Sequence, residues 1–394
     1  MFKLWNTVCA STLLAACMIG GAASAADCEV KIGATGPMTG SAAARGLALK
    51  AATDFEAKMV NDAGGLQMGN QKCKVTVLSI DAQYTASGGA AASNYFASQG
   101  IHVVMGPIGS PEATGFKTVA ARNNQVNYTS AYYAQALGPD FPLTFHFEQN
   151  SVAWGPKLVE AGKKVFGFKT AIILGPNDQG GTDPATALHK LYGDQGVNAT
   201  EEYYQRGTTN FGPMATRIMA ANPDLVEFAG TPPGDLKPIV RQLLEAGYKG
   251  VFAGLAGGGS VETLIEAAGG VQNVKGYFWL EEVPVDSADS EKLRQDFKKV
   301  MNEEPSVRGI FYTSVVGVEQ LLRGIQIAGT DQDGAKVAEA MRHMTPESKY
   351  YGKGGWRGKA QFGINQELAF PVGMGLIKDG KREKSVSVPL PAEE

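Results

Sequence analysis

Two loops that follow predicted strands contain the residues best suited to holding a small anion. In the loop at residues 106–112, Ser110 and Pro111 form a strong helix start, with the serine as N-cap and the proline as the first helical residue. The positive end of such a helix stabilises a carboxylate by about 0.3–2 kcal/mol, in addition to its hydrogen bonds. The loop at residues 33–41 combines glycines with hydroxyls and suits close approach of an anion, although an ordinary strand–helix turn explains it equally well. From these loops we expect solute contacts from Pro37, Gly109 and Ser110.

A cluster of tyrosines marks the end of another predicted strand. Tyr128, Tyr132 and Tyr133 could stack on a solute and donate phenolic hydrogen bonds, or they could pack against a neighbouring helix or lobe. In the second half of the chain, the loops at residues 175–181, 229–233 and 254–259 follow apolar strands and are small, polar or glycine-rich, which suits the rim of a cleft. From these four loops we expect solute contacts from Ala131, Tyr132, Tyr133, Asp178, Gln179, Thr231 and Ala256.

The sequence contains no set of residues with catalytic spacing. Ser110 is followed by Pro111 and Glu112, so it lacks the Gly-x-Ser-x-Gly elbow of hydrolases. The histidines show no pairing at the spacing of metal ligands or of a catalytic triad; they are His102, His146, His189 and His343. We therefore expect no enzyme activity, no metal site and no cofactor.

Length and charge narrow the class of protein further. A chain of 394 residues suggests two domains. The formal net charge is −3, and no basic run with interleaved aromatics occurs, so we expect no nucleic-acid partner.

Residues 1–26 have the pattern of an export signal. Lys3 gives a basic start, residues 13–22 are apolar, and the small residues 23–26 form an A-x-A exit, which predicts cleavage after Ala25 or Ala26 and a location in the periplasm. The segment before Cys17 resembles a lipobox, and a cut there would leave a lipid-anchored form. Polar residues interrupt that segment, which favours the later cut.

Removal of the signal leaves two cysteines, Cys28 and Cys73. Each lies two residues before an apolar strand pattern, at residues 30–32 and 75–77. Parallel strands of a βαβ unit have their matching ends level, so the two sulfurs should be close together. An oxidising compartment permits the bond, and we expect a disulfide.

The body of the chain reads as strands alternating with helices, which predicts parallel sheets covered on both faces. In the first part the predicted strands are 30–33, 75–80, 101–105 and 126–129, with helices at 43–61, 89–98 and 111–123. The alternation of helices and strands begins again with a helix at 152–165, and strands are predicted at 169–174, 197–203, 225–228, 250–253 and 276–280. Helices are then expected at 289–302, 311–327 and 334–342, a late strand at 369–377 and a loosely ordered tail after Lys384.

Several segments, in this order, resemble the branched-chain amino-acid binding proteins of ABC transporters, the Leu/Ile/Val-binding type with the type I periplasmic binding fold. The most specific are residues 32–40 (IGATGPMTG), 61–66 (NDAGGL), 105–110 (MGPIGS), 208–211 (TTNF), 222–224 (NPD) and 242–247 (QLLEAG). The resemblance implies an α/β fold with two Rossmann-like lobes, each with a parallel sheet, joined by three hinge crossovers that let the lobes close on a solute. It also implies a monomer that delivers the solute to the membrane permease of an ABC transporter.

The crossovers are expected near Phe147, Glu282 and Phe362. This places residues 27–147 and 283–362 in an N-terminal lobe, and residues 148–282 and 363–394 in a C-terminal lobe. In the resembling family, the loops that match Ser110 and residues 131–133 hold the carboxylate and ammonium of the ligand, and the second lobe supplies an aromatic residue and an acidic partner.

The sequence departs from the family pattern at two points. Gln179-Gly180 replaces a frequent Tyr-Gly pair, and the loop near residues 253–259 has no acidic residue to pair with a ligand ammonium. An uncompensated buried ammonium is costly, although Asp178 could replace the missing charge. The expected ligand is thus an amino acid or related carboxylate, with an aromatic acid or an amide as the alternative. A subunit that presents the solute to a sensor has the same sequence features.

Overall fold

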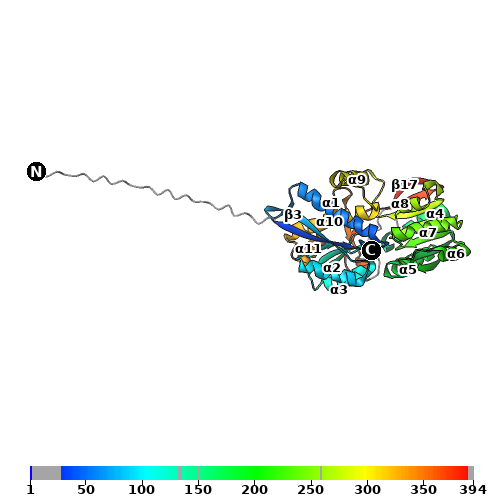
Figure 1. Ribbon diagram of the computed structural model, residues 1–394, viewed down its shortest axis with the longest axis horizontal. Helices are drawn as coiled ribbons and strands as arrows, with labels where there is room; N and C mark the ends of the chain where they lie inside the picture. Colours follow the sequence, from blue (N-terminus) through cyan, green and yellow to red (C-terminus); the bar gives the residue numbers. More distant parts are fainter. Residues whose placement is uncertain (2–27, 132–134, 150, 258–259, 389–394) are drawn as a thin grey trace.

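The structure is a computed structural model that describes Met1 and residues 28–131, 135–149, 151–257 and 260–388 (Figure 1). The predicted export signal, with Cys17, and the predicted site residues Tyr132 and Tyr133 lie outside the described residues. Figure 1 shows two α/β bodies side by side, called here the first and second lobes.

The first lobe is built on an eight-stranded sheet in the order β14-β15-β6-β5-β4-β1-β3-β2. Its strands are β1 (Glu29–Gly36), β2 (Leu66–Met68), β3 (Gln71–Asp81), β4 (Val103–Met105), β5 (Val126–Thr129), β6 (Thr144–His146), β14 (Gly355–Arg357) and β15 (Glu367–Ala369). The strands pair in parallel except for the two edge strands, β2 and β14. The hairpin that adds β2 was absent from the predicted elements.

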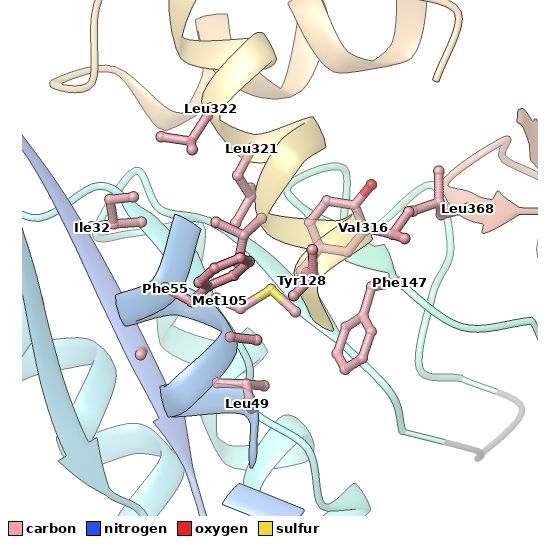
Figure 2. Packing of buried hydrophobic residues seen from close by; sticks show 14 of the residues in the cluster. Ile32, Leu49, Phe55, Met105, Tyr128, Phe147, Val316, Leu321, Leu322 and Leu368 are labelled. Carbon is pink, nitrogen blue, oxygen red and sulfur yellow. The ribbon is translucent and has the colours of Figure 1, made fainter. Parts of the chain in front are cut away.

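Helices cover both faces of this sheet. On one face α1 (Ala43–Asp62) packs against α10 (Arg308–Ala328), with α9 (Ala288–Met301) and α11 (Gly334–His343) beside them; on the other, α2 (Ala86–Ser98) packs against α3 (Ser110–Ala120). In the core of the first face, Phe55 of α1 and Leu321 of α10 converge on Met105 and Tyr128 of the sheet (Figure 2). The periodic apolar face of each helix therefore covers the sheet and leaves the strand ends free to carry the site.

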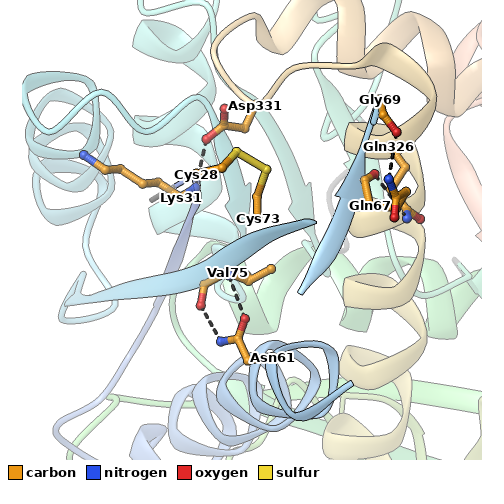
Figure 3. The surroundings of a disulfide bond; sticks show 9 residues. All are labelled: Cys28, Lys31, Asn61, Gln67, Gly69, Cys73, Val75, Gln326 and Asp331. Atoms are coloured by element: carbon orange, nitrogen blue, oxygen red, sulfur yellow. Dashed lines mark hydrogen bonds between the residues drawn. A yellow bond between two sulfur atoms is a disulfide. The ribbon is translucent and has the colours of Figure 1, made fainter. Parts of the chain in front are cut away.

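The predicted disulfide is confirmed. Cys28 and Cys73 are bonded, with an S–S distance of 2.02 Å, at the level ends of β1 and β3, where Glu29 pairs with Lys74 (Figure 3). On the same strand the side-chain amide of Asn61 makes two hydrogen bonds of 2.8 Å with the backbone of Val75, which attach the end of α1 to the sheet.

The second lobe contains a seven-stranded sheet in the order β17-β16-β11-β10-β9-β7-β8. Its strands are β7 (Thr170–Pro176), β8 (Asn198–Tyr204), β9 (Leu225–Ala229), β10 (Val251–Ala256), β11 (Gly276–Glu281), β16 (Val372–Lys378) and β17 (Lys381–Val388). Helices α4 (Ser151–Phe166) and α5 (Gln179–Asp194) enclose one apolar cluster of this sheet, and α6 (Gly212–Ala221), α7 (Pro233–Glu245) and α8 (Val261–Ala267) another. The predicted α/β fold with two mostly parallel sheets is confirmed, with antiparallel strands at the sheet edges.

The C-terminal part departs from the sequence prediction. The tail after Lys384, expected to be loose, continues β17 up to Val388, because the turn after Lys378 folds it back on β16 in antiparallel register. The last passage between the sheets lies between Ala369 and Val372, later than the expected crossover near Phe362. The exact lobe boundaries stay a prediction. Within the described residues, none of the helices combines the length and apolar character needed to cross a membrane.

Candidate functional site

The carboxyl ends of the strands in both lobes face one another, and hydrogen bonds join the lobes there. Thr114 at the start of α3 donates its hydroxyl to the side-chain oxygen of Gln179 at the start of α5, at 3.0 Å. Arg45 of α1 donates to the carbonyl of Gly257 after β10, also at 3.0 Å. The lobes are therefore in contact across the cleft, and the solute site must be sought between them.

A small cavity of about 20 Å³ lies between the strand ends, and we call it the arginine compartment. Its wall is formed by residues that follow β1, β3, β4, β5, β7, β8 and β9, among them Arg45, Tyr84, Ser110, Ser130, Gly180 and Arg206. Loops at the carboxyl ends of parallel strands from both sheets thus meet at one point, as open α/β sheets arrange their ligand sites.

Two arginines give this compartment its charge. Arg206 is held by Asp178 through hydrogen bonds of 2.5 and 3.0 Å, and its Nη1 is buried without a hydrogen-bond partner among the described residues. The Nε of Arg45 is also buried and unpaired within the described part of the chain. Buried donors without acceptors are costly, so these groups favour an anionic partner. The described residues that line the compartment include no acidic side chain.

The helix start beside the compartment differs from the prediction in one detail. The N-cap of α3 is Gly109, and Ser110 is the first helical residue, because Glu112 reaches back and accepts a hydrogen bond of 3.0 Å from the N–H of Gly109. Glu112 also accepts from the N–H of Tyr84 at 2.8 Å, and its burial raises its pKa to about 7 against the lowering effect of these hydrogen bonds. Ser110 is released from capping and lines the compartment.

A second cavity, of about 100 Å³, lies next to the crossovers, and we call it the glutamate compartment. It is lined by Arg45, which it shares with the arginine compartment, by the start of α10, and by the aromatic side chains of Tyr277 and Trp279. Its acidic lining residues are Glu148, Glu262, Glu281 and Glu282.

The carboxylates of this compartment have oxygens without donors. Glu148 accepts a hydrogen bond of 2.9 Å from Thr313 through Oε1, whereas its Oε2 is buried without a donor among the described residues. The Oε1 atoms of Glu262 and Glu281 are in the same situation. Burial raises the pKa of Glu148, opposed by the charge of Arg45, and burial also raises the pKa of Glu281. This compartment therefore favours a group that donates hydrogen bonds or carries positive charge.

The predicted site residues that the structure describes fall into two groups. Gly109, Ser110, Asp178 and Gln179 lie at or beside the arginine compartment. The others are occupied within their own lobes: the Thr231 hydroxyl donates to the Leu174 carbonyl, the Ala131 N–H donates to Thr129, the Ala256 carbonyl accepts from Gly230, and the Pro37 carbonyl lies against Gly46. Solute contact by any of them stays a prediction.

Sequence reasoning missed Arg45, Tyr84, Glu148 and Arg206. Arg206 follows the predicted strand 197–203, and Tyr84 follows 75–80, so inspection of every strand end would have found both. Glu148 is the neighbour of Phe147, where a crossover was expected. Arg45 gave no comparable signal, because an arginine in the first turn of a helix is ordinarily exposed.

Two sheets, facing strand ends and a cleft with charged compartments define a two-lobed solute-binding protein. The sequence profile of the periplasmic binding protein family matches residues 29–371, so the chain belongs to that family. It is 27% identical over 346 residues to the leucine-, isoleucine-, valine-, threonine- and alanine-binding protein of Pseudomonas aeruginosa, covering 86% of this chain and 89% of the relative. It is also 26% identical over 335 residues to a Leu/Ile/Val-binding protein homolog of Brucella melitensis, covering 83% and 86%. These matches confirm the resemblance to the branched-chain amino-acid binding proteins.

Solved structures confirm the type I periplasmic binding fold. The branched-chain amino acid transporter substrate binding protein LivJ from Streptococcus pneumoniae, in complex with isoleucine, superimposes with a TM-score of 0.76 at 17% identity, covering 92% of this chain and 99% of that one. A solute binding protein of an ABC transporter from R. palustris, in complex with benzoate, gives a TM-score of 0.75 at 16% identity, covering 93% and 98%.

Proposed function

We propose that this protein is the periplasmic solute-binding component of an ABC importer, and that it captures an amino acid or a related carboxylate between its lobes for delivery to the permease. Membership of the periplasmic binding protein family supports the binding role. The relatives named as leucine-, isoleucine- and valine-binding proteins support the choice of solute class.

The observation that carries the proposal is the opposite polarity of two adjoining compartments. Among the described residues, the arginine compartment has buried donors without acceptors, and the glutamate compartment has buried acceptors without donors, while Arg45 lines both. A solute with a carboxylate at one end and N–H groups at the other satisfies both sets. The ammonium partner missing from the loop near residues 253–259 would then come from Glu148, Glu262 or Glu281 instead.

A second candidate is an aromatic acid. Tyr277 and Trp279 line the glutamate compartment with their rings stacked, at a centroid distance of 4.9 Å and an interplanar angle of 21°. The R. palustris structural neighbour contains benzoate. An aromatic carboxylate would use the arginines and this stacked wall, but it would leave the buried glutamate oxygens without donors.

A thermal-shift screen of the mature chain separates these candidates. The panel contains aliphatic amino acids, their desamino acids and amides, benzoate and 4-hydroxybenzoate, and small dicarboxylates. A solute at about 100 times its Kd adds about 2.7 kcal/mol of stability, so a true partner raises the Tm clearly. The proposal predicts the largest shift for an amino acid; a shift for aromatic acids alone supports the second candidate, and no shift for any carboxylate contradicts both.

The delivery step has its own test. Uptake of the radiolabelled hit is measured in cells that lack the gene and in the same cells complemented with the wild-type protein. Uptake restored by the wild-type protein and not by an Arg206→Ala variant supports a role in import. Unchanged uptake in the deletion strain would contradict it and favour the sensor role.

A further inference from the structure

We infer that Tyr84 is a positioning residue that latches the two lobes together, by closing from the first lobe over Arg206 and against Gly180 of the second. The inference rests on the proposed function, because only a protein that traps its solute needs a closed state. It assigns a role to a side chain that follows β3 and belongs to none of the predicted binding loops.

The first observation is the contact between the ring and the guanidinium. The Arg206 guanidinium carbon lies 4.0 Å from the centroid of the Tyr84 ring. Asp178 accepts from Nε and Nη2 of the same group, so the ring covers one face while the carboxylate holds one edge. A cation over an aromatic face is attracted by the ring quadrupole, and more strongly where water is excluded. The remaining nitrogen of the guanidinium is Nη1, which has no acceptor among the described residues.

The second observation is the steric fit of the ring between two helix starts. A Cβ added to Gly180, at the start of α5 in the second lobe, would lie 2.0 Å from the Tyr84 hydroxyl oxygen. A Cβ added to Gly109, the N-cap of α3 in the first lobe, would lie 2.6 Å from the ring. Both distances are far below van der Waals contact, so an alanine at either position would force the ring to shift from its place between the two helix starts.

The third observation is the backbone that presents the ring. Gln83 and Tyr84 are consecutive non-glycine residues with positive φ, at 55° and 56°. Asp81 accepts from the N–H of Gln83 at 2.8 Å, and Glu112 accepts from the N–H of Tyr84 at 2.8 Å. Left-handed non-glycine residues are unfavourable and persist where surrounding hydrogen bonds impose them, which occurs often at ligand clamps.

These observations together define a latch that is complete only when the lobes meet. Tyr84, Gly109 and Glu112 come from the first lobe, whereas Gly180 and Arg206 come from the second. In an open form, Arg206 would keep Asp178 and lose the ring. Closure therefore positions Nη1 towards the solute and shields the guanidinium from water in the same movement.

The test measures closure without any solute. Thr114→Cys and Gln179→Cys place one thiol in each lobe at positions whose side-chain oxygens are 3.0 Å apart in the closed form. A short bifunctional thiol reagent then traps each closing event, while the native cysteines are protected by their bond. Trapping rates are divided by the rates at which the single cysteines react with a monofunctional reagent.

Four proteins with this reporter pair are compared: the parent, Tyr84→Ala, Gly180→Ala and the double variant. We expect trapping to fall about three- to tenfold in Tyr84→Ala, since the cation–π contact is lost, and more than about tenfold in Gly180→Ala, since the new Cβ meets the hydroxyl. In the double variant the obstacle is gone, and trapping should return to within about twofold of Tyr84→Ala.

Matched controls are Tyr95→Ala, an exposed tyrosine on α2, and Gly193→Ala, a glycine of α5 with nothing within 4 Å of the added Cβ. Both should trap like the parent, and the Tm of each variant monitors folding. Equal trapping in Tyr84→Ala and the parent, or the same loss from Gly180→Ala with and without Tyr84, would overturn the inference. Because no solute is present, failure here leaves the solute screen as an independent test of the proposed function.

Discussion

The two compartments of the cleft adjoin each other and share Arg45, yet they favour opposite partners. In the arginine compartment, cationic side chains from both lobes have buried N–H groups with no acceptor in the described part of the chain. In the glutamate compartment, the carboxylates of Glu148, Glu262 and Glu281 have buried oxygens for which the described residues supply no donor. From this difference we expect the cleft to bind a solute with oppositely charged ends. The strand-end loops would contact one end, and the segments that join the lobes would contact the other.

The charge of a compartment depends on which of its ionic groups are already paired. The sequence made Asp178 a candidate partner for the solute ammonium. In the structure both of its carboxylate oxygens accept hydrogen bonds from Arg206. Asp178 therefore stabilises a cation of the protein and not one of the solute. Glu148 has Arg45 close enough for its charge to lower the pKa of the carboxyl, and within the described part of the chain its Oε2 has no donor. Variants that each remove one charge therefore test whether the two compartments bind different ends of the solute.

Removal of Arg206 should have the largest effect. In Arg206→Ala the carboxylate of the solute loses a charged donor, and Asp178 is left as an unpaired negative charge beside it. A hydrogen bond to a charged group contributes about 1.5–3 kcal/mol, so affinity for any carboxylate hit should fall about 10- to 100-fold or more, as measured by isothermal titration calorimetry. The effect should be similar for an amino acid and its desamino acid.

The control for this variant is Arg217→Ala, which removes an exposed arginine paired with Glu202 on the surface. It should bind like the wild type. Affinity retained in Arg206→Ala would show that the arginine compartment does not hold the carboxylate.

Neutralising Glu148 should have a smaller and more selective effect. Glu148→Gln keeps the size of the side chain and a hydrogen-bond acceptor but removes its charge, so an amino acid should bind about 10-fold more weakly. The desamino acid has no ammonium to lose and should bind as before. Equal weakening of both solutes would contradict the division into two compartments.

Lowering the pH should, like Glu148→Gln, weaken binding of the amino acid more than binding of the desamino acid. Because burial raises the pKa of Glu148 above its ordinary value, this carboxyl takes up its proton at a higher pH than an exposed glutamate does. A neutral carboxyl attracts an ammonium less, so amino-acid affinity should decline by a few-fold as the pH is lowered from neutral into the acidic range. Titrations of the desamino acid over the same range should show the smaller change, and Glu148→Gln should reduce the pH dependence for the amino acid.

Glu227 provides a buried carboxyl that lines neither compartment, and its replacement should leave affinity unchanged. Its oxygens accept from the N–H of Leu255 at 2.7 Å and from the hydroxyl of Tyr192 at 2.6 Å. Burial raises its pKa to about 8, from 4.5. A raised pKa means that the folded state holds the proton more tightly, so this group stabilises the fold fully below about pH 4.5, and that stability is lost as the pH rises through about 8.

The loss amounts to about 1.4 kcal/mol for each unit between the two pKa values. Glu227→Gln stays neutral at every pH, so its unfolding free energy should fall less between pH 5 and pH 8 than that of the wild type, in denaturant titrations. A parallel decline in both proteins would show that Glu227 does not titrate as inferred.

The fold was largely predictable because its signals are local and repeated. Apolar runs such as Val103–Met105, followed by Gly106, and periodic helices such as Gly212–Ala221, followed by Asn222, are bounded by residues typical of turns, and the order of elements leaves few topologies. The disulfide was predictable for the same reason, because Cys28 and Cys73 occupy matching positions before two parallel strands. The strand β2 was missed because its three residues are too few to show a pattern, and β17 was missed because its mostly exposed polar residues lack an apolar one.

The site was predictable only in part. Strand-end position identified Ser110 and Asp178, because it follows from the chain order alone. It could not show that Asp178 pairs with Arg206, or that Arg45 and Glu148, distant in the sequence, line the same cavity. Such pairings depend on the way two lobes meet, which no single segment encodes.

The most direct test of the account is a crystal structure of the mature protein with the best amino acid from the screen. We expect the solute carboxylate within hydrogen-bond distance of Arg206 Nη1 beside Ser110, and its ammonium facing Glu148, Glu262 or Glu281. A solute bound in the reverse orientation, or bound outside the two compartments, would contradict it.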